Sequence, residues 1–416
     1  MLNLKQDVLI LGGGVIGLSC ALFLLKQGRS VRILEKNTVG GATSHGNCGT
    51  ITPSHARPLA APGMIGKALK YMTQSDAPFY VKPSTDLALL EWLLRFSLRC
   101  NVKDMHQAAL AKASLLNASR TLLQTTIEQH QLDCAFSASG VMYAFNSQQG
   151  LDEMLHELPL LRECAVRAEV LSASELAQRE PALKSTMVGG IFFPDDAHFR
   201  PDAYCAELAR MVRELGGVIE EHCEVQALHC FAGKIQTVQT NQGNYEAENV
   251  VIAMAVWSVA LAKSIDLNLP IQPGKGYSIT YSKPEIMPQT PLVLFERSVC
   301  VTAWPDGYRL GSTMEFSGFD DKLNAKRLAA LERGAHEYLH EPFGDEVQER
   351  WFGWRPMTYD DLPIIGKSPK HENLFLATGH GMLGMSMSAI TGQLIAELIA
   401  EQKPCVDVKP FCASRF

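Results

Sequence analysis

Short apolar runs separated by a glycine-rich turn open the chain. Residues 8–11 are apolar, residues 12–17 read Gly-Gly-Gly-Val-Ile-Gly, an amphipathic stretch follows, and a second apolar run ends at Glu35. This order predicts a strand, a tight turn, a helix and a second strand. The G-x-G-x-x-G spacing, with an acid about 20 residues further on, is typical of a dinucleotide-binding βαβ unit.

Each residue of this fingerprint has a physical role. Gly12 permits the tight turn, Gly14 lets the backbone approach a pyrophosphate, and Gly17 lets the helix pack closely on the strand. The helix N-terminus offers free N–H groups to the phosphates, and Glu35 is expected to bind the ribose hydroxyls. The predicted contacts of this unit are Gly12, Gly14, Val15, Ile16, Gly17, Glu35 and Lys36.

Three further segments indicate which dinucleotide is bound. Residues 40–50 form a small-residue loop rich in hydroxyl and amide groups, which can follow a diphosphate and a flavin ring closely. Residues 248–258 have the pattern of a buried strand that ends in small residues. Residues 352–358 and 373–384 combine strands with a glycine-rich turn that opens a long apolar helix, so a second helix N-terminus is expected at the site. Together the segments favour a flavin over a nicotinamide.

Length and composition fit two domains around a large core. The chain has 416 residues, 46% of them hydrophobic, and a net charge of −6 without a cluster of Lys and Arg, which argues against nucleic acid as a partner. Its 11 cysteines contain no C-x-x-C pair, and the histidines show no metal-ligand spacing. These features predict reduced thiols, no metal site and a cytoplasmic protein without a signal peptide. Residues 381–400 are apolar but contain Ser386, Thr391 and Glu397, so they predict a buried helix rather than a membrane span.

Taken together, these segments resemble the D-amino acid oxidase superfamily of FAD enzymes over nearly the whole chain. The likeness is strongest to its bacterial D-amino acid dehydrogenases, through residues 43–50, 61–78, 89–101, 275–280 and 353–356. The resemblance implies an α/β fold in which a Rossmann-like FAD-binding domain is interleaved with an α+β substrate domain. The FAD-binding domain is expected at residues 1–75, 170–262 and 350–416, with helices on both faces of a mostly parallel sheet, and the substrate domain at residues 76–169 and 263–349.

Several elements of the substrate domain can be predicted individually. Residues 101–130 predict one long amphipathic helix, and residues 276–281 and 308–313 predict antiparallel strands. Residues 87–98 are unusually apolar for a surface helix and are expected to form core, a membrane-surface contact or a subunit contact. The dehydrogenase resemblance favours a membrane-surface or subunit contact, because such enzymes pass electrons to the respiratory chain. The protein is therefore expected in the cytoplasm, with peripheral contact at the inner face of the cell membrane.

The resemblance also implies how FAD is held. In the sarcosine oxidase branch of the superfamily a cysteine near the position of Arg355 carries the flavin covalently, and no cysteine stands there in this chain. FAD is therefore expected to be non-covalent, with Cys48 a small apolar filler. The family usually has a glycine where Met254 or Ala255 stands, so the backbone there is expected slightly further from the cofactor. Further FAD contacts are expected at Thr43, Ser44, Asn47, Gly49, Thr50, Val225, Gly379, Gly381, Leu383 and Gly384.

The substrate site implied by the resemblance is built around one cation. Arg355 matches the family's substrate arginine and is expected to bind the substrate carboxylate in a bidentate pair. Tyr277 is expected to add a phenol to the same carboxylate or to the amine. Further candidates for contacts with substrate or flavin are Tyr308, Tyr143, His45 and His380.

The implied function is FAD-dependent oxidative deamination of D-amino acids. The substrate is oxidised to its imino acid, with hydride passing from Cα to flavin N5, and hydrolysis yields the 2-oxo acid and ammonia. Electrons are expected to pass to a quinone or another acceptor that is not oxygen. Two alternatives stay open. One is a dehydrogenase or oxidase of hydroxyproline, another cyclic imino acid or a secondary amine, and the other is an FAD-binding subunit of a heteromeric complex.

Overall fold

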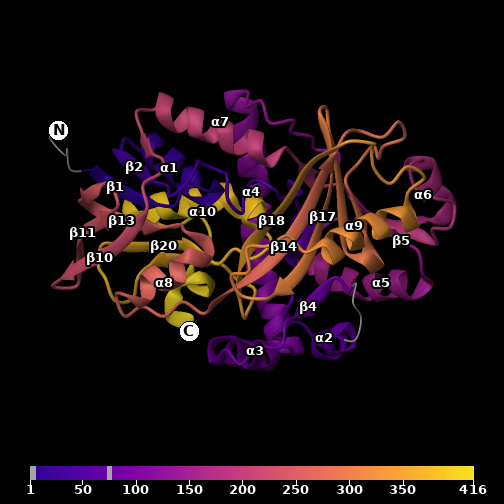
Figure 1. Cartoon of the computed structure of the whole chain (residues 1–416), viewed down its shortest axis with the longest axis horizontal. Coiled ribbons are helices and arrows are strands. Elements are labelled where there is room, and N and C mark those ends of the chain that lie inside the picture. The colour runs from indigo at the N-terminus through magenta and orange to yellow at the C-terminus, as the bar shows by residue number, and fades with distance from the viewer. Residues whose placement is uncertain (1–5, 73–76) are drawn as a thin grey trace.

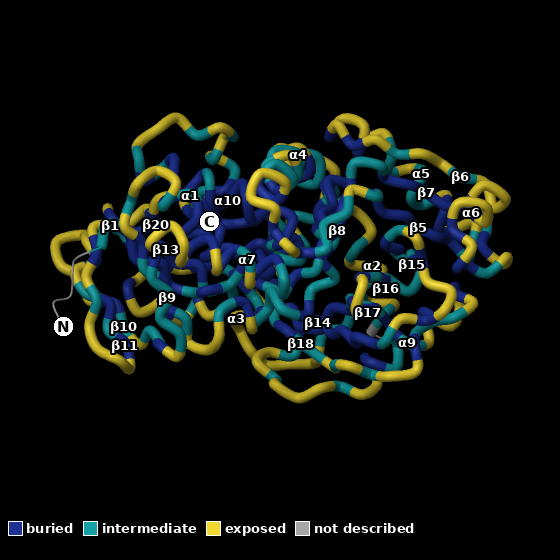
Figure 2. Tube along the Cα trace, turned by 90° about the horizontal axis from the view of Figure 1, so that it is seen from above, coloured by how far each residue is buried: buried dark blue, intermediate teal, exposed yellow. Residues whose placement is uncertain are grey.

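Two large β-sheets lie side by side along the long axis of the molecule (Figure 1). The computed structural model describes residues 6–72 and 77–416. Six strands form the first sheet and nine form the second. Figure 2 shows that the buried part of the chain runs through both halves, while the exposed part follows the outer loops and helices. No helix in the described ranges is long and apolar enough to cross a membrane.

The first sheet is the dinucleotide-binding fold that the opening of the chain predicts. Its order is β19-β20-β13-β1-β2-β9, and all neighbours are parallel except β19 and β20. The sheet is therefore mostly parallel, which confirms the predicted fold class. Its strand β1 leads through the glycine turn into α1. The strands are β1 (Gln6–Leu11), β2 (Val31–Leu34), β9 (Val218–Glu220), β13 (Ala247–Ile252), β19 (Ile364–Lys367) and β20 (Leu374–Thr378).

The two faces of this sheet are covered differently. Val8 and Ile10 point into a core shared with the helices of one face, as strand alternation requires. Leu9 and Leu11 point into a second core, whose cover is a small antiparallel sheet and one short helix rather than the layer of helices that was expected. The helical face has α1 (Val15–Lys26), α4 (Val102–His130), α7 (Pro201–Glu214) and α10 (Gly384–Ile399). The other face has β10 (Val225–Phe231), β11 (Lys234–Thr240), β12 (Gly243–Tyr245) and α8 (Ser258–Lys263).

The second sheet is mixed and is built from distant parts of the chain. Its order is β18-β14-β17-β16-β15-β5-β7-β6, with β4 paired to β17. The strands are β4 (Phe79–Val81), β5 (Val141–Phe145), β6 (Glu169–Ser172), β7 (Gly189–Phe193), β14 (Ile271–Tyr281), β15 (Leu292–Leu294), β16 (Val299–Trp304), β17 (Gly307–Phe316) and β18 (Val347–Thr358). The helix α9 (Ala325–Tyr338) packs on one face. Pairing thus places β6, β7 and β18 in this sheet, although most of their residues were assigned to the FAD-binding domain; the domain boundaries stay a prediction.

The remaining elements surround the junction of the two sheets. The long helix α4 has the bounds that the sequence predicts, because the Asn101 side chain caps its N-terminus by accepting from the Asp104 amide at 3.0 Å. The buried helix near the C-terminus also forms as predicted, as α10. The other elements are β3 (Thr50–Ile51), β8 (Ala197–His198), α2 (Met64–Met72), α3 (Leu87–Arg99), α5 (Gln148–Glu163), α6 (Ala173–Arg179) and short 3₁₀ turns at Pro53–Ala56, Ala255–Trp257, Phe295–Arg297, Lys409–Phe411 and Ala413–Arg415.

Candidate active site

A cavity of about 870 Å³ lies where the two sheets meet. Its wall draws on the start of α1, the loop before β3, the start of α10, and the strands β14, β16, β17 and β18. The predicted site residues on this wall are Gly14, Val15, Ile16, Thr43, Ser44, Asn47, Thr50, Tyr277, Arg355, Gly381, Leu383 and Gly384. The structure therefore brings together the early loop, the C-terminal turn and the predicted substrate arginine.

Two helix N-termini open on this cavity. Gly14 is the N-cap of α1 and Leu383 that of α10, and neither helix start is capped by the side chain of its N-cap residue. The first-turn N–H groups of a helix lack partners within the helix and attract anions. Ser44 Oγ accepts from the Val15 amide at 3.1 Å, which holds the early loop against the start of α1. A dinucleotide with an anionic pyrophosphate fits this arrangement in both charge and size.

The fingerprint glycines are required by the backbone itself. Gly12 has φ +106°, and a Cβ there would lie 2.6 Å from the carbonyl oxygen of Ala253. A Cβ on Gly17 would lie 1.9 Å from the carbonyl oxygen of Gly12. Neither residue lines the cavity; they let α1 approach β1 closely enough for Gly14 to do so. Ala253 and Ala255 do line the cavity, and Ala255 adopts the left-handed backbone (φ +49°) that a glycine would adopt more easily.

Glu35 lies at the end of β2, beside the glycine turn. Its Oε2 accepts from the Gly13 amide at 2.7 Å and its Oε1 from the Asn37 amide at 2.8 Å. The carboxylate is partly exposed, so it can still accept from ribose hydroxyls beyond the wall of the cavity. The structure places two predicted neighbours elsewhere: the Lys36 side chain is exposed and paired with Glu224, and Val225 packs against the core under the small sheet.

Replacing Glu35 with alanine is expected to weaken FAD binding while the substrate contacts stay intact. Hydrogen bonds to a charged group contribute about 1.5–3 kcal/mol, which corresponds to a Kd for FAD raised roughly 10- to 150-fold. Titration of the apoprotein with FAD measures this change, and added FAD should restore activity. Glu224→Ala, which removes a nearby exposed carboxylate, is the matched control and should keep the parent's Kd.

The loop of residues 43–50 is fixed from both sides. Thr43 Oγ1 donates to the carbonyl of Trp354 at 3.0 Å, and the buried Arg309 donates to the carbonyls of His45 and Asn47 at 3.0 and 2.8 Å. Gly49 does not line the cavity. It adopts φ +73°, and a Cβ there would lie 1.9 Å from the carbonyl oxygen of Phe199, so both the backbone angle and the space require glycine. The loop is thus held rigidly along the cavity, as a loop that follows a cofactor must be.

The C-terminal turn brings a second pair of glycines near the site. Gly379 and Gly381 have φ +73° and +53°, and only Gly381 lines the cavity. His380, between them, also lines the cavity and is hydrogen-bonded through Nε2 to Thr391 Oγ1 at 2.9 Å. Burial lowers the pKa of His380 to about 3, so the imidazole stays neutral at physiological pH.

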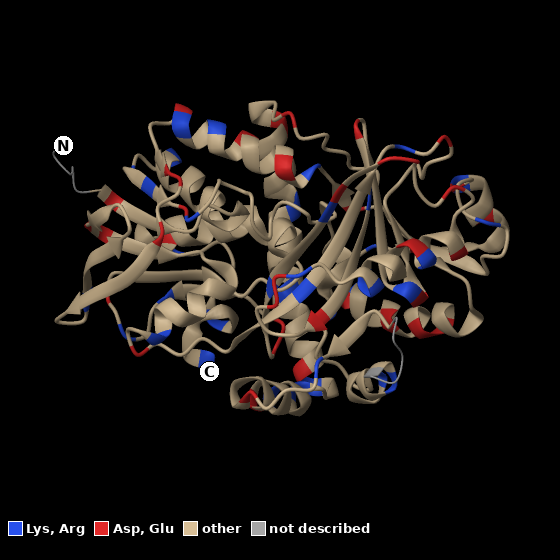
Figure 3. Cartoon of the chain, viewed as in Figure 1, with Lys and Arg blue, Asp and Glu red and all other residues tan. Residues whose placement is uncertain are grey.

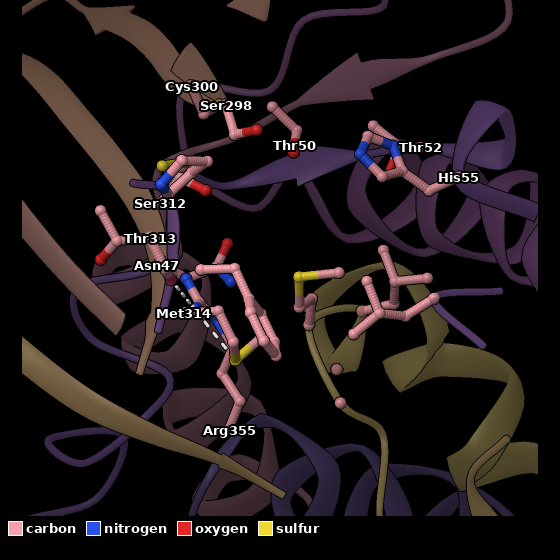
Figure 4. Close-up of a pocket in the computed structure, with 18 of the residues that line it drawn as sticks. Asn47, Thr50, Thr52, His55, Ser298, Cys300, Ser312, Thr313, Met314 and Arg355 are labelled. Carbon is pink, nitrogen blue, oxygen red and sulfur yellow. Dashed lines mark hydrogen bonds between the residues drawn. The ribbon is translucent and has the colours of Figure 1, made fainter. Parts of the chain in front are cut away.

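Arg355 is a cation without a carboxylate partner on the cavity wall. Its guanidinium donates to the carbonyl of Thr313 and contacts the sulfur of Met314 at 3.9 Å, and it forms no ion pair in the described part of the chain. Desolvation lowers its pKa to about 10, which leaves it charged at neutral pH. Figure 4 shows Arg355 beside Thr313 and Met314 on one side of the pocket, with His55 on the other. A charged guanidinium in this position is suited to bind an anionic ligand in two hydrogen bonds.

A strained bulge supports Arg355. The register of β14 against β17 shifts between Lys275 and Tyr277, opposite Ser312 and Thr313. Ser312 has φ +128° and Thr313 φ +62°, conformations that are costly for a residue with a Cβ and rare for a β-branched one. The bulge turns the carbonyl of Thr313 toward the guanidinium of Arg355.

Gly276 provides the space in which the guanidinium lies. A Cβ on Gly276 would lie 2.4 Å from Cζ of Arg355. Gly276→Ala is therefore expected to displace the guanidinium without unfolding the strand, and to lower kcat/KM about 100-fold, as small misplacements of a binding group do. Steady-state kinetics with a flavin absorbance spectrum measure both effects. Gly307→Ala in the same sheet is the control, because its nearest neighbour would lie 3.4 Å away and no loss is expected.

Tyr308 lies off the cavity wall, contrary to the expectation of a substrate contact, whereas Tyr277 lines the cavity from the face of β14 opposite to that of Gly276. Successive residues of a strand point to opposite faces, and Gly276 is the residue beneath Arg355. Both phenols pack in the core under α9, and Tyr308 does not line the cavity at all. Tyr277 reaches the cavity wall, but its hydroxyl donates to Glu315 at 3.2 Å. Burial raises the pKa of both phenols, so they remain protonated.

His45 also lies off the cavity wall. Its Nε2 is 2.8 Å from Oε1 of Glu349 on β18, and this carboxylate raises the pKa of His45. The pair ties the early loop to the second sheet. Its place in the sequence, within a flavin loop, suggested a contact that the side chain does not make.

Two residues of the cavity wall, His55 and Cys300, were not predicted from the sequence, and Tyr143 was only one of several further candidates. His55 and Tyr143 line the wall across from Arg355, with the phenol oxygen 3.2 Å from Nε2 of the imidazole. Burial lowers the pKa of His55 to about 4, so the imidazole is neutral at neutral pH. Cys48 and Cys300 also line the cavity. His55 comes from the turn at Pro53–Ala56 and Cys300 from β16, segments without a motif of their own, so no local pattern could identify them.

Comparison with known sequences agrees with this geometry. Residues 7–398 match the model of the family described as DAO, FAD dependent oxidoreductase. A D-amino acid dehydrogenase of Vibrio cholerae serotype O1 (strain ATCC 39541) is 32% identical over 402 residues, which cover 95% of each chain. A D-amino acid dehydrogenase of Chromohalobacter salexigens is 32% identical over 425 residues, covering 99% of this chain and 100% of that protein.

Solved structures show the same fold. Glycine oxidase from Geobacillus kaustophilus superposes with a TM-score of 0.80 at 24% identity, covering 99% of both chains. L-proline dehydrogenase from P. horikoshii superposes with a TM-score of 0.78 at 17% identity, covering 100% of this chain and 98% of that one. At these identities the likeness concerns the fold alone. With a family match over nearly its whole length and a cavity that fits the cofactor, the chain belongs to the DAO family of FAD dependent oxidoreductases.

Proposed function

We propose that this protein oxidises free D-amino acids to 2-oxo acids and ammonia and passes the electrons to an acceptor that is not oxygen. One observation carries the proposal: Arg355, a charged guanidinium without a protein carboxylate in the described chain, lies on the wall of the cavity that the FAD-binding loops also line. The D-amino acid dehydrogenases that are 32% identical to this chain support the substrate class.

The protein's own groups position the substrate. Arg355 binds the carboxylate in a bidentate pair, and the carbonyl of Thr313 and the bare backbone of Gly276 fix the guanidinium. His55 and His380 are neutral, so neither repels an ammonium group or competes with Arg355 for the carboxylate. Bound FAD supplies the hydride acceptor. The imino acid that results hydrolyses in water to the 2-oxo acid and ammonia.

Turnover of the isolated chain with a reducible dye tests the proposal. A panel of D- and L-amino acids and cyclic or secondary amines should reduce the dye only with D-amino acids, with little hydrogen peroxide formed in air. Activity confined to L-substrates or secondary amines would overturn the substrate class. Abundant peroxide would identify an oxidase. A yellow but inactive chain that becomes active with a second protein would indicate a subunit of a heteromeric complex.

We also propose that α2 and α3 contact the surface of an anionic bilayer. Both helices lie along one edge of the molecule (Figure 1). The α3 helix buries Trp92 and Phe96 and leaves a second apolar stripe in solvent, with Leu94 61% and Leu98 68% exposed. The exposed apolar residues of the two helices are Ile65, Leu69, Leu87, Leu90, Leu94 and Leu98. Leucines at this spacing are typical of a helix that lies in a membrane interface.

The position of this edge beside the cavity favours a bilayer over a soluble partner. Figure 3 shows both signs of charge along this edge, and Arg95 and Arg99 beside the apolar stripe are paired with Glu91 and Asp104. Lys67 and Tyr71 of α2 also line the cavity, so an acceptor dissolved in the bilayer would meet the site at this edge. A lipid-soluble quinone is an acceptor that dissolves in the bilayer.

Sedimentation with vesicles that contain anionic lipid tests the contact. The parent protein should co-sediment, and Leu94→Glu combined with Leu98→Glu should abolish co-sedimentation, because charges on an apolar face oppose insertion. Phe231→Glu, which changes a 74% exposed apolar residue on β10 in the other half of the molecule, should leave it unchanged. The proposal would be contradicted if the parent protein did not sediment with the vesicles. It would also be contradicted if Phe231→Glu reduced co-sedimentation as much as the double leucine variant.

A further inference from the structure

Two thiols lie together on the cavity wall and have no role in the proposed oxidation. Cys48 lies in the loop of residues 43–50, next to Asn47, whose carbonyl accepts from Arg309. Cys300 lies on β16. Both side chains are partly exposed, and both line the cavity. Cys48 Sγ lies against Gly311, the residue paired with Cys300 on the neighbouring strand. Cys48, predicted to be a small filler, thus lies beside a second thiol.

Gly311 explains how a loop residue and a strand residue come into contact. Cys300 and Gly311 are directly paired on neighbouring antiparallel strands, so their side-chain positions are adjacent on one face of the sheet. A Cβ on Gly311 would lie 2.4 Å from Sγ of Cys48. The thiol of Cys48 therefore occupies the space that the absent side chain leaves, beside Cys300. Thiols in contact can form a disulfide without a large backbone movement.

The surroundings assign different roles to the two thiols. The neighbouring Cys300 thiol lowers the pKa of Cys48, and the positive charges of Arg309 and Arg355 act in the same direction against the effect of burial. The same interaction raises the pKa of Cys300, which keeps its proton. Because the thiolate is the reactive form of cysteine, Cys48 is the nucleophile and Cys300 the partner. By contrast, partial desolvation raises the pKa of Cys230 and of Cys405.

We propose that Cys48 and Cys300 form a peroxide-reactive dithiol site on the wall of the substrate cavity. The Cys48 thiolate attacks one oxygen of hydrogen peroxide, the O–O bond breaks, hydroxide leaves, and Cys48 becomes a sulfenic acid. The Cys300 thiol then attacks this sulfur, the S–O bond breaks, a disulfide forms, and water leaves. Two thiols are oxidised to one disulfide, and one peroxide is reduced to two waters. The disulfide ties the early loop to β16 and is reversed by a dithiol reductant.

Peptide mapping after peroxide treatment of the holoenzyme tests this site. Brief exposure to hydrogen peroxide, followed by alkylation of the remaining thiols and mass spectrometry, should reveal a Cys48–Cys300 disulfide before Cys230 or Cys405 is oxidised. Dithiothreitol should remove it, and the FAD content should not change. Oxidation of Cys230 or Cys405 first, or no Cys48–Cys300 disulfide, would overturn the proposal.

Single substitutions separate the two roles. Cys300→Ala should let the Cys48 sulfenic acid accumulate, so that dimedone labels Cys48. Cys48→Ala should leave Cys300 reduced under the same exposure, and Cys230→Ala, outside the cavity, should form the disulfide as the parent does. If Cys300 is oxidised just as fast in the Cys48→Ala protein, the nucleophile has been assigned to the wrong thiol. The readout is covalent, so it does not depend on which substrate the enzyme takes.

Discussion

Replacing Arg355 with alanine is expected to lower kcat/KM for D-amino acids by about 30-fold to several thousand-fold, while FAD stays bound. Removing one side of a buried charge pair costs about 2–5 kcal/mol, since the substrate carboxylate would enter the cavity without its partner. Arg355 is the cation on the cavity wall that makes no ion pair in the described chain, and the predicted FAD-binding residues lie on other elements. Steady-state kinetics and the absorbance spectrum of the bound flavin measure the two quantities separately.

Two further substitutions define what Arg355 contributes. Arg355→Lys keeps the charge but loses the two-point geometry. Its kcat/KM should therefore lie between those of the parent and of the alanine variant, and the decrease should come mainly from a raised KM. Arg95→Ala removes an arginine from the surface of α3 and should leave kcat/KM unchanged. If the Arg355→Ala protein oxidises D-amino acids as the parent does, the carboxylate is bound elsewhere and the proposed site is wrong.

Of the substitutions proposed for this protein, Lys112→Met is expected to lower the free energy of unfolding most. Lys112 Nζ on α4 lies 2.5 Å from Oδ2 of Asp361, and the two side chains are only 3% and 6% exposed. The same carboxylate oxygen accepts from the Leu59 amide at 2.9 Å. Loss of the ammonium leaves a buried carboxylate with one neutral donor, at a cost of about 3–5 kcal/mol in the free energy of unfolding. The midpoint of thermal unfolding should fall clearly.

The double variant and a surface control test this explanation. Lys112→Met combined with Asp361→Asn removes the unpaired charge while the amide oxygen still accepts from Leu59, so part of the lost stability should return. Arg210→Met breaks exposed ion pairs on α7 and should not shift the midpoint measurably. An unchanged midpoint in Lys112→Met would show that the buried pair does not stabilise the fold.

Local pattern was sufficient to predict the βαβ unit and the two helix N-termini that open on the cavity. The close contact of Gly17 with Gly12 lies within one βαβ unit, and the turn before α10 is equally local. The small sheet on the other face was missed, although its turn carries a signal. Ala232 and Gly233 both adopt positive φ between two alternating runs, as a tight hairpin requires.

The substrate half depends on register between strands that are far apart in the sequence. Tyr277, Ile279 and Tyr281 alternate along β14 and share the core under α9, a period-two pattern that could have indicated their burial. What the sequence could not indicate is that Arg355 of β18 pairs with Gly274 and lies over Gly276. The contact of His55 with Tyr143 spans 88 residues and likewise depends on tertiary packing.

Anaerobic mixing of the purified holoenzyme with single amino acids tests the central claim most directly. The visible absorbance of the bound flavin should disappear with D-alanine or another D-amino acid and persist with its L-enantiomer, because reduction requires a carboxylate on Arg355 with Cα placed for hydride transfer. The same D-amino acid should bleach the flavin of the Arg355→Ala protein far more slowly. Bleaching by L-amino acids alone, or no bleaching by any D-amino acid, would contradict the account.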